Sequence, residues 1–268
     1  MPSTGHSSRD VVQSLERGLM VLREFSVKRT PLSISDLSEA LDLSRPAVRR
    51  MLLTLESLGY TTQTGPLWTL TPRVLEIGAG YFVSTSLPEI AHPFLHTLAD
   101  ELGETCTLAV YDRGEVVQTA RAEVQRIVPD AIRVGTRLPA HATALGTLLL
   151  GTLDPGELDE YFASATLDRY TPGTLVDESA LRDRIDQARV DGYAASAEEL
   201  EAGMIAVAVP VVGDRTFLAA LGSASTTART SIDEMIAEYV PAMRLTADEV
   251  ARTYQLGNPS NRPSRRTL

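Results

Sequence analysis

Cysteine is nearly absent from the sequence. Cys106 is the single cysteine among 268 residues, which excludes an intramolecular disulfide and any zinc site built from several cysteines. It lies in an apolar run, so we expect an inert core residue. The chain also lacks an apolar run of the ~18 residues that a membrane span needs. Its polar beginning, "MPSTGHSSRD", shows no hydrophobic signal segment. We therefore expect a cytoplasmic protein with no membrane partner.

Motifs that carry catalytic chemistry are also scarce. No Gly-x-Ser-x-Gly motif is present, and the run "GTLLLGT" at 146–152 lacks the lysine that a phosphate loop needs after its second glycine. His92, His96 and Asp100 have metal-ligand spacing along a predicted helix. Pro93 between the histidines and the lack of a fourth ligand favour an ordinary helix surface. The sequence thus predicts no catalytic residue, no metal and no cofactor.

Charge is distributed unevenly along the chain. The net charge is −10, yet residues 1–75 hold nine Lys and Arg against seven Asp and Glu. The remaining residues are strongly acidic. Such asymmetry indicates two domains with different partners. Because phosphate binding depends on local positive charge, the acidic total does not exclude a DNA-binding first domain.

Three arginines crowd the beginning of one predicted helix, within "LDLSRPAVRRMLLTLESLGY" at 41–60. Ser44 is expected to cap this helix, Arg45 and Arg49 stand four residues apart, and Arg50 lies beside them. The helix dipole is already positive there, so cations are unfavourable unless an anion binds. We expect Arg45 and Arg49 to read guanine edges in the major groove of double-stranded DNA, and Ser44 and Arg50 to contact phosphates. The alternative is a solvated helix face without a partner.

The flanking segments complete a winged helix-turn-helix over 11–71. Helices are predicted at 11–26 and 32–42, the second one capped by Ser33 with Asp36 in the capping-box position. A tight turn joins the second helix to the arginine helix, and "TTQTGPLWTL" predicts a β-hairpin. The other candidate DNA contacts in this domain are Ser33, Ser35, Ala47 and Thr64.

The remaining sequence predicts a linker helix at 72–87, which helps dimerisation, and an α+β domain over 88–256. Small residues at 78–80 would let another helix approach closely. Strands are expected in "TCTLAVY", "EVVQTARA", "AIRV", "IAVAVPVV" and "FLAALGSAS", and short turns between some of them indicate a largely antiparallel sheet. Helices are expected at about 139–152, 154–163, 177–191 and 231–256. Residues 1–10 and 257–268 are expected to be disordered.

These segments together resemble the IclR (isocitrate lyase regulator) family of bacterial transcription regulators. The matching stretches are "SLERGLMVLREFS", "DLSRPAVRRMLLTLESLGY", "WTLTPRVLEIGAGY", "IRVGTRLPAHATALGTLLLGTL" and "GYAASAEELEAGMIAVAVPV". The resemblance is strongest to the subgroup that regulates protocatechuate, 4-hydroxybenzoate and β-ketoadipate pathway genes. It implies a winged-helix domain, a linker helix and a GAF-like effector-binding domain. It also implies homodimers, often paired into tetramers, on operators near catabolic promoters.

The resemblance further implies an effector pocket in the second domain. Its expected residues are Cys106, Leu108, His141, Thr143, Ala144, Leu145, Glu199, Ile205, Ala206, Gly222 and Ala224. Several positions that are polar or cationic in the subgroup are apolar or small here, within 142–147, 203–207 and 221–224. Arg121 and Arg133 lie on predicted strands and are expected to face solvent, with neutralisation of a carboxylate as the alternative.

An unpaired buried carboxylate is costly, so we expect a neutral or weakly polar effector that is aromatic or hydrophobic. The acidic loop at 196–203 is interpreted as solvated charge, or as the source of one carboxylate that accepts hydrogen bonds from this small molecule.

The leading hypothesis is therefore an effector-responsive regulator of catabolic genes that binds an inverted-repeat operator as a dimer. Two alternatives stay open: a small-molecule enzyme with an N-terminal assembly module, and a DNA-binding regulator with no effector.

Overall fold

The structure is a computed structural model that describes residues 12–28, 30–124, 132–214 and 216–257. The chain divides into two compact units, Met1–Ser84 and Thr85–Leu268. Residues 1–10 and 257–268, for which we predict disorder, lie outside the described residues except for Gly257, which is the last residue of a helix. Within the described part of the chain, no helix is long and apolar enough to cross a membrane.

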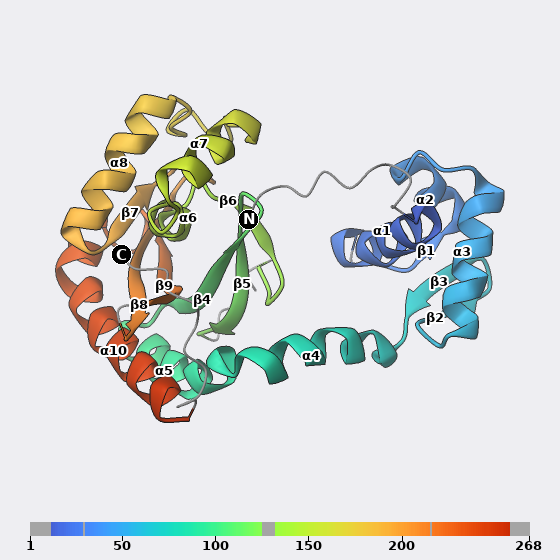
Figure 1. Cartoon of the computed structure of the whole chain (residues 1–268), viewed down its shortest axis with the longest axis horizontal. Coiled ribbons are helices and arrows are strands. Elements are labelled where there is room, and N and C mark those ends of the chain that lie inside the picture. Colours follow the sequence, from blue (N-terminus) through green and yellow to red (C-terminus); the bar gives the residue numbers. More distant parts are fainter. Residues whose placement is uncertain (1–11, 29, 125–131, 215, 258–268) are drawn as a thin grey trace. The chain divides into compact units, whose positions relative to one another are not determined.

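The first unit is a three-helix bundle with a small antiparallel sheet (Figure 1). Its elements are α1 (Gln13–Lys28), β1 (Leu32–Ser33), α2 (Ile34–Ala40), α3 (Arg45–Ser57), β2 (Thr61–Thr64) and β3 (Leu67–Leu70). The predicted β2–β3 hairpin is present, and β1 adds an unpredicted third strand in the order β1-β3-β2. Trp68 is 1% exposed and packs with apolar residues of all three helices in the core of this unit.

Helix caps fix the boundaries of α2 and α3. Ser33 Oγ accepts a hydrogen bond from Asp36 N at 3.2 Å, and Asp36 Oδ2 accepts one from Ser33 N at 2.8 Å, so the predicted capping box is present. Ser44 occupies the N-cap position of α3, but its hydroxyl makes no capping hydrogen bond. The predicted N-cap residue is therefore correct, and only the side-chain hydrogen bond of a full cap is missing. The first turn of α3 also lacks an acidic residue, which leaves its N–H groups open to an anion.

A helical segment follows the hairpin. Thr71 caps the short η1 (Pro72–Val74), which continues into α4 (Leu75–Thr85), so the predicted helix after Thr71 is present. Ser86, with φ of 46°, separates α4 from α5 (Leu87–Leu102).

The second unit contains a six-stranded antiparallel sheet in the order β6-β5-β4-β9-β8-β7 (Figure 1). The strands are β4 (Thr105–Asp112), β5 (Glu115–Ala122), β6 (Arg137–Pro139), β7 (Ala194–Ala197), β8 (Met204–Gly213) and β9 (Thr216–Thr226). The helices after α5 are α6 (Ala144–Leu150), α7 (Pro155–Ser164), α8 (Glu178–Asp191), α9 (Ile232–Glu234) and α10 (Val240–Gly257), with the π-helical turn η2 (Met235–Tyr239) before α10.

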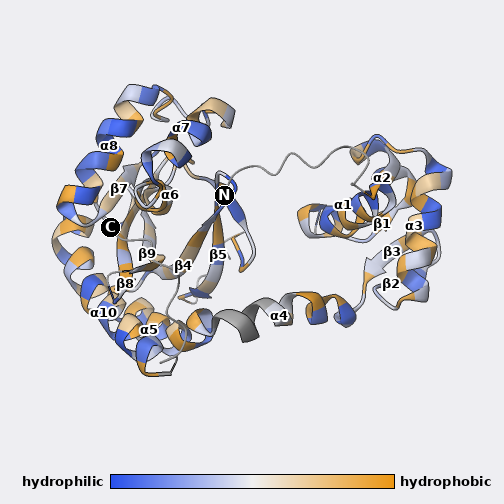
Figure 2. Ribbon diagram, in the orientation of Figure 1, coloured by the Kyte–Doolittle hydropathy of each residue, from blue (hydrophilic) through white to orange (hydrophobic). Residues whose placement is uncertain are grey.

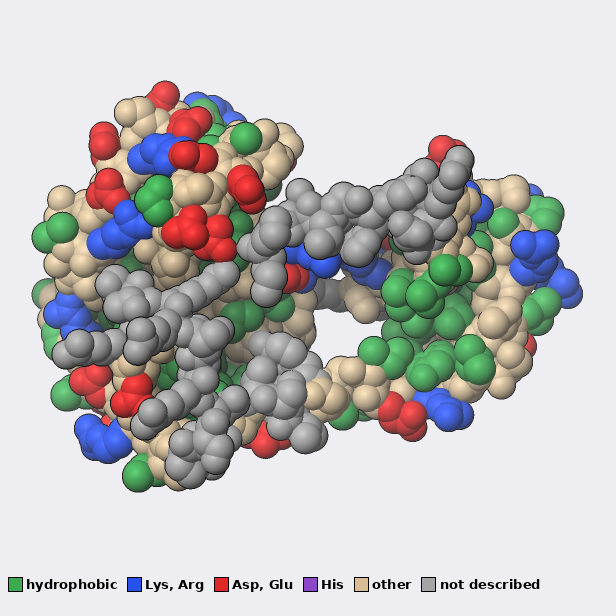
Figure 3. Space-filling view, in the orientation of Figure 1, with side chains coloured by type: hydrophobic (Ala, Val, Ile, Leu, Met, Phe, Trp, Pro, Cys, Tyr) green, Lys and Arg blue, Asp and Glu red, His purple; other side chains and the backbone are tan. Residues whose placement is uncertain are grey.

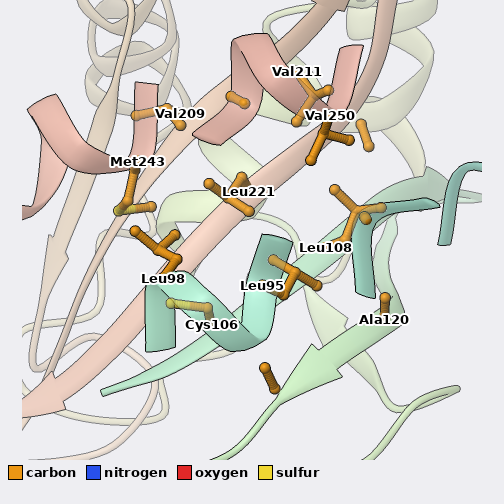
Figure 4. Packing of buried hydrophobic residues seen from close by; sticks show 14 of the residues in the cluster. Leu95, Leu98, Cys106, Leu108, Ala120, Val209, Val211, Leu221, Met243 and Val250 are labelled. Carbon is orange, nitrogen blue, oxygen red and sulfur yellow. The ribbon is translucent and has the colours of Figure 1, made fainter. Parts of the chain in front are cut away.

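Each face of this sheet packs against its own helices. Leu108 and Leu221 point to one face, where they pack with α5 and α10 (Figure 4). Their neighbours Ala109 and Ala220 point to the other face, where α6, α7 and α8 lie. Alternation along each strand thus builds two cores. The strands are predominantly hydrophobic, whereas α8 presents a hydrophilic outer surface (Figure 2).

Two predicted boundaries in this unit are wrong. The strand predicted at 131–134 is absent over its described residues, 132–134. A turn that contains Gly135, with φ of 84°, follows this segment, and the edge strand of the sheet is β6. The helix expected from Pro139 begins only at Ala144, where Thr143 Oγ1 accepts a hydrogen bond from Gly146 N at 3.0 Å. Pro139 pairs with Glu115 in the sheet, so the chain must first leave the sheet before it can turn into a helix.

Candidate functional sites

The N-terminal half of α3 presents an exposed cationic surface. Ser44, Arg45, Arg49 and Arg50 are all exposed. The three arginine side chains make no hydrogen bond or ion pair with any residue that the structure describes. Figure 3 shows Lys and Arg side chains grouped over α3. Cations at a helix N-terminus without acidic partners are electrostatically unfavourable in the isolated chain, and an anionic partner removes that cost.

The helix period places the three arginines on different parts of that surface. Val48, Leu52 and Leu55 define the buried side of α3. At about 100° per residue, Arg50 projects from the opposite side, and Arg45 and Arg49 from the edge between the two.

The other candidate DNA-contact residues differ in solvent exposure and in whether their hydroxyl groups already form hydrogen bonds. Ser35 and Thr64 are exposed, the latter on the hairpin strand β2. Ala47 is half-buried. The Ser33 hydroxyl is already engaged in the capping box. The hydroxyls of Ser35 and Thr64 are therefore accessible, whereas Ser33 Oγ already accepts a hydrogen bond from Asp36 N.

A pocket of about 630 Å³, including its open mouth, lies on the α6 side of the large sheet. It is bounded by β4, β5, β8 and β9, by the beginning of α6 and by the loop after β7. Of the expected effector-binding residues, the pocket contains Thr143, Ala144, Leu145, Glu199, Ala206, Gly222 and Ala224. Further lining residues are Thr105, Thr107, Gln118, Arg121, Ile132, Leu138, Ala142, Ser196, Leu200, Met204, Val207 and Ser223. Most of this surface is apolar, as in pockets that bind small organic molecules.

Arg121 lines this pocket, contrary to the expectation that it faces solvent. Its side chain is only 6% exposed and donates hydrogen bonds to Glu123 Oε1 at 2.9 Å and to Thr107 Oγ1 at 3.4 Å. Arg133, by contrast, is 52% exposed and pairs with the same Glu123 oxygen. The prediction of a neutral effector assumed that no cation faces the pocket. Arg121 does face it, paired with Glu123, so a carboxylate in the pocket would have a cation beside it.

Gln118 adds an unsatisfied amide to the same wall. The residue is 3% exposed, and its buried Oε1 has no hydrogen-bond partner among the described residues. A register shift in the β4–β5 pairing puts Thr107 opposite Arg121 and Ala109 opposite Gln118. Residues three apart normally face opposite sides of a strand, and this bulge turns both to the pocket. A buried amide without a partner costs free energy that a bound ligand can recover.

Glu199 is a buried, paired carboxylate. Its two oxygens lie 2.6 and 2.7 Å from Arg184 Nη1, and Arg184 Nη2 donates to the His141 carbonyl at 2.5 Å. Glu198 instead accepts a hydrogen bond from Gly203 N at 2.9 Å, and Glu201 is exposed. The acidic loop is thus only partly solvated, and the one glutamate at the pocket is already neutralised.

Four expected effector-binding residues lie outside the pocket. Cys106, Leu108 and Ile205 face the opposite core, and burial raises the pKa of the Cys106 thiol to about 12. His141 is 2% exposed; its Nε2 lies 3.0 Å from the Asp168 carbonyl, and its ring stacks on Tyr170. The sequence reasoning missed Thr105 and Thr107, which alternate with Cys106 and Leu108 along the same strand. The prediction chose the wrong face of this strand, because successive residues of a strand point to opposite faces of the sheet.

Comparison with known proteins places both units in one family. The model of the IclR helix-turn-helix domain matches residues 14–65, and the model of the bacterial transcriptional regulator IclR C-terminal region matches residues 79–252. The chain is 36% identical over 249 residues to the p-hydroxybenzoate hydroxylase transcriptional activator of Acinetobacter baylyi, covering 91% of this chain and 92% of that protein.

Solved structures give the same result. A transcriptional regulator from Rhodococcus sp. RHA1 is 38% identical with a TM-score of 0.80, covering 92% of this chain and all of the other. An IclR homologue from Microbacterium hydrocarbonoxydans, solved as a complex with 4-hydroxybenzoate, is 26% identical with a TM-score of 0.80, covering 91% of this chain and 99% of the other.

Proposed function

The chain belongs to the IclR family of bacterial transcriptional regulators, and on that premise we propose that it regulates catabolic genes by binding an inverted-repeat operator under the control of a small aromatic acid. DNA binding, rather than catalysis, is its proposed activity. The observation that supports this proposal most directly is the exposed arginine cluster of α3, whose side chains have no partner among the described residues.

We propose that α3 enters the major groove. Arg45 and Arg49 read base edges there, Ser44 and Arg50 contact phosphates, and the β2–β3 hairpin brings Thr64 to the backbone. One winged helix specifies few base pairs, so the homodimer reads two half-sites related by a two-fold axis. Further pairing into a tetramer is compatible with this arrangement.

The effector is proposed to carry a carboxylate rather than to be neutral. Arg121 supplies a buried guanidinium, which the acid group would share with Glu123, and Gln118 Oε1 accepts a hydrogen bond from a ring hydroxyl. The apolar remainder of the pocket covers an aromatic ring. Two similar proteins support this class: one is named for p-hydroxybenzoate hydroxylase activation, and the other was solved with 4-hydroxybenzoate.

The first experiment selects a binding site from randomised duplex DNA with the full-length protein. An inverted repeat should emerge. Thermal shift then compares 3- and 4-hydroxybenzoate and protocatechuate with their methyl esters, and the acids should stabilise the protein more than the esters. Failure to select any sequence would refute the DNA-binding proposal. Stabilisation by the esters alone would restore the neutral-effector hypothesis.

Two matched arginine variants test the carboxylate assignment. Arg121→Met should weaken binding of the acids by about 10- to 100-fold, because a charge-assisted hydrogen bond contributes about 1.5–3 kcal/mol. Arg133→Met is the control, since it also pairs with Glu123 but is largely exposed, and it should leave the affinity unchanged. Equal effects of the two substitutions in calorimetric titration would argue against Arg121 as the anchor.

A further inference from the structure

Leu145 and Gly222 form one side of the effector pocket. Leu145 lies in the first turn of α6, and its side chain is partly buried. Gly222 faces it from β9. A Cβ atom added to Gly222 would lie 2.8 Å from Leu145 Cδ2 and 2.9 Å from Leu145 Cγ, closer than real Cβ atoms approach other atoms. Leu145 therefore packs directly on the glycine and occupies the space that a larger residue at position 222 would fill.

Strand register places Leu145 across the pocket from Arg121. Thr107 on β4 pairs with Arg121 on β5 and with Gly222 on β9, so these three residues form one row across the sheet. All three line the pocket. Adjacent strands are about 4.8 Å apart, so the backbones of Arg121 and Gly222 are separated by about 10 Å. Because Leu145 stands on the last residue of the row, it closes the side of the pocket that faces β5.

The two proposed polar contacts of the effector both lie on β5. Arg121 faces the acid group, and the buried Gln118 Oε1, which has no hydrogen-bond partner among the described residues, faces the ring hydroxyl. A ring that carries these groups at opposite ends therefore lies along β5, and one of its long edges faces β9.

The remaining width of the pocket is small. Arg121 Nη1 donates a hydrogen bond to Thr107 Oγ1 at 3.4 Å, so the guanidinium extends toward the middle strand of the row. Measured across the sheet, the distance from there to Leu145 is closer to one strand spacing, about 5 Å, than to two. This width suits one aromatic ring, whereas a second ring fused along the edge facing β9 would overlap Leu145.

We propose that Leu145, packed on Gly222, is a specificity-determining residue that limits the effector to an acid with a single aromatic ring. The inference rests on the proposed function for the acid group at Arg121 and deepens it by defining the opposite side of the pocket. An apolar wall there contacts the edge of one ring and excludes a wider molecule by steric overlap.

Two acids with the same polar groups test this limit in the full-length protein. 4-Hydroxy-1-naphthoate holds its acid and hydroxyl groups in the same relation as 4-hydroxybenzoate and adds a second ring along one edge. The wild-type protein should bind the two-ring acid at least about tenfold more weakly, because a single extra methylene in an apolar pocket already changes affinity by about 10- to 200-fold. Leu145→Ala should bring the two affinities to within about twofold of each other. Calorimetric titration gives both values for one preparation, so their ratio does not depend on the folded fraction of a variant.

Leu138→Ala is the matched control. Leu138 also lines the pocket and is partly buried, so the substitution removes the same atoms. Its strand, β6, lies on the side of β5 away from β4 and β9, behind the proposed polar contacts. This variant should keep the wild-type preference for one ring. An equal gain for the two-ring acid in Leu138→Ala, or wild-type protein that binds both acids alike, would overturn the proposal.

Gly222→Ala tests the support of Leu145. The added methyl group must displace the leucine side chain, so the affinity for 4-hydroxybenzoate should fall about tenfold. In the Leu145→Ala background the same methyl group meets no leucine, and the loss should be about twofold at most. Equal losses in the two backgrounds would show that the glycine does not act through Leu145.

The outcome is separable from that of the proposed function. If the wild-type protein selects an inverted repeat and binds 4-hydroxybenzoate, but Leu145→Ala leaves the ratio of the two affinities unchanged, only this inference fails. If no hydroxybenzoate binds, the proposed effector class fails whatever the naphthoate does. Wild-type affinity of Leu145→Ala for the selected operator, measured without an acid, confirms that the variant is folded.

Discussion

Arg121 and Thr107 face one another across the β4–β5 ladder, and both point into the pocket. Ala122 and Cys106 are the next residues on those strands, and they point into the opposite core. At the residue scale, a displacement of one position therefore decides whether a side chain lines the pocket or packs against α5 and α10. The same distinction separates Met204 and Ala206, which line the pocket, from Ile205, which does not.

The arginines of α3 yield a prediction at this scale. Loss of a bidentate guanine contact in Arg49→Ala should cost about 1–3 kcal/mol of operator binding and relax specificity at one base pair. Arg50→Ala should instead weaken binding to all sequences alike and lower the salt slope by about one.

Gel-shift titrations over a salt series, on the selected operator and its single-base variants, distinguish the two roles. Arg50 projects from the side of α3 opposite the core, so it could also reach the bases. If Arg50→Ala relaxed specificity and Arg49→Ala lowered only the salt slope, Arg50 would be the residue that reads a base and Arg49 the one that contacts a phosphate. Wild-type affinity in Arg45→Ala, Arg49→Ala and Arg50→Ala alike would remove α3 from the DNA interface.

At the scale of elements, capping boxes define where helices begin. Ser33 and Asp36 form one at α2, and Ser231 and Glu234 form another at α9. The pKa of Asp36 is lowered mainly by the hydrogen bond from the Ser33 backbone N–H, and that of Glu234 mainly by the hydrogen bond from the Ser231 backbone N–H. Each carboxylate stabilises its helix only while it is ionised.

A pH dependence follows for the first unit. Because the folded pKa of Asp36 is lowered, its contribution is present above the unfolded pKa of about 3.9 and is lost as the pH falls through the folded value. Urea unfolding should therefore show the first unit losing stability below about pH 4, and Asp36→Asn should reduce this pH dependence. Trp68 is the sole tryptophan and lies in that core, so its fluorescence reports this unit. An identical pH profile in Asp36→Asn would contradict the assignment.

At the scale of the whole molecule, the hydrophobic cores belong to separate units. The first unit packs around Trp68, whereas the second is built on the two faces of its large sheet. The charge follows the same division, since the acidic excess lies after residue 75 and the exposed arginine cluster before it. DNA binding and effector binding therefore rest on separate hydrophobic cores.

Thermal unfolding should show separate transitions for the two units. Saturating hydroxybenzoate at about 100 times its Kd stabilises the unit that binds it by about 2.7 kcal/mol. We expect the main calorimetric transition to shift upward, while the Trp68 fluorescence transition stays within about 1 °C of the ligand-free value. Equal shifts of both transitions would show that the two units unfold as one cooperative block.

The sequence by itself determined the local features of this protein. Periodicity located the helices of the first unit and most strands of the second, and the Ser33–Asp36 spacing predicted a capping box that the structure contains. The family resemblance and the antiparallel sheet could also be predicted from the sequence. Both depend on motifs and short turns formed by residues that are close together in the chain.

Only the tertiary structure decided the chemistry of the pocket. A bulge between β4 and β5 turned Gln118 and Arg121 to the same side, and Arg184 came from α8 to neutralise Glu199. Pairing with β5 held Pro139 in the sheet and moved the beginning of α6 to Ala144. Strand register and the partners of a charge are set by contacts between residues far apart in the chain, and no local pattern records them.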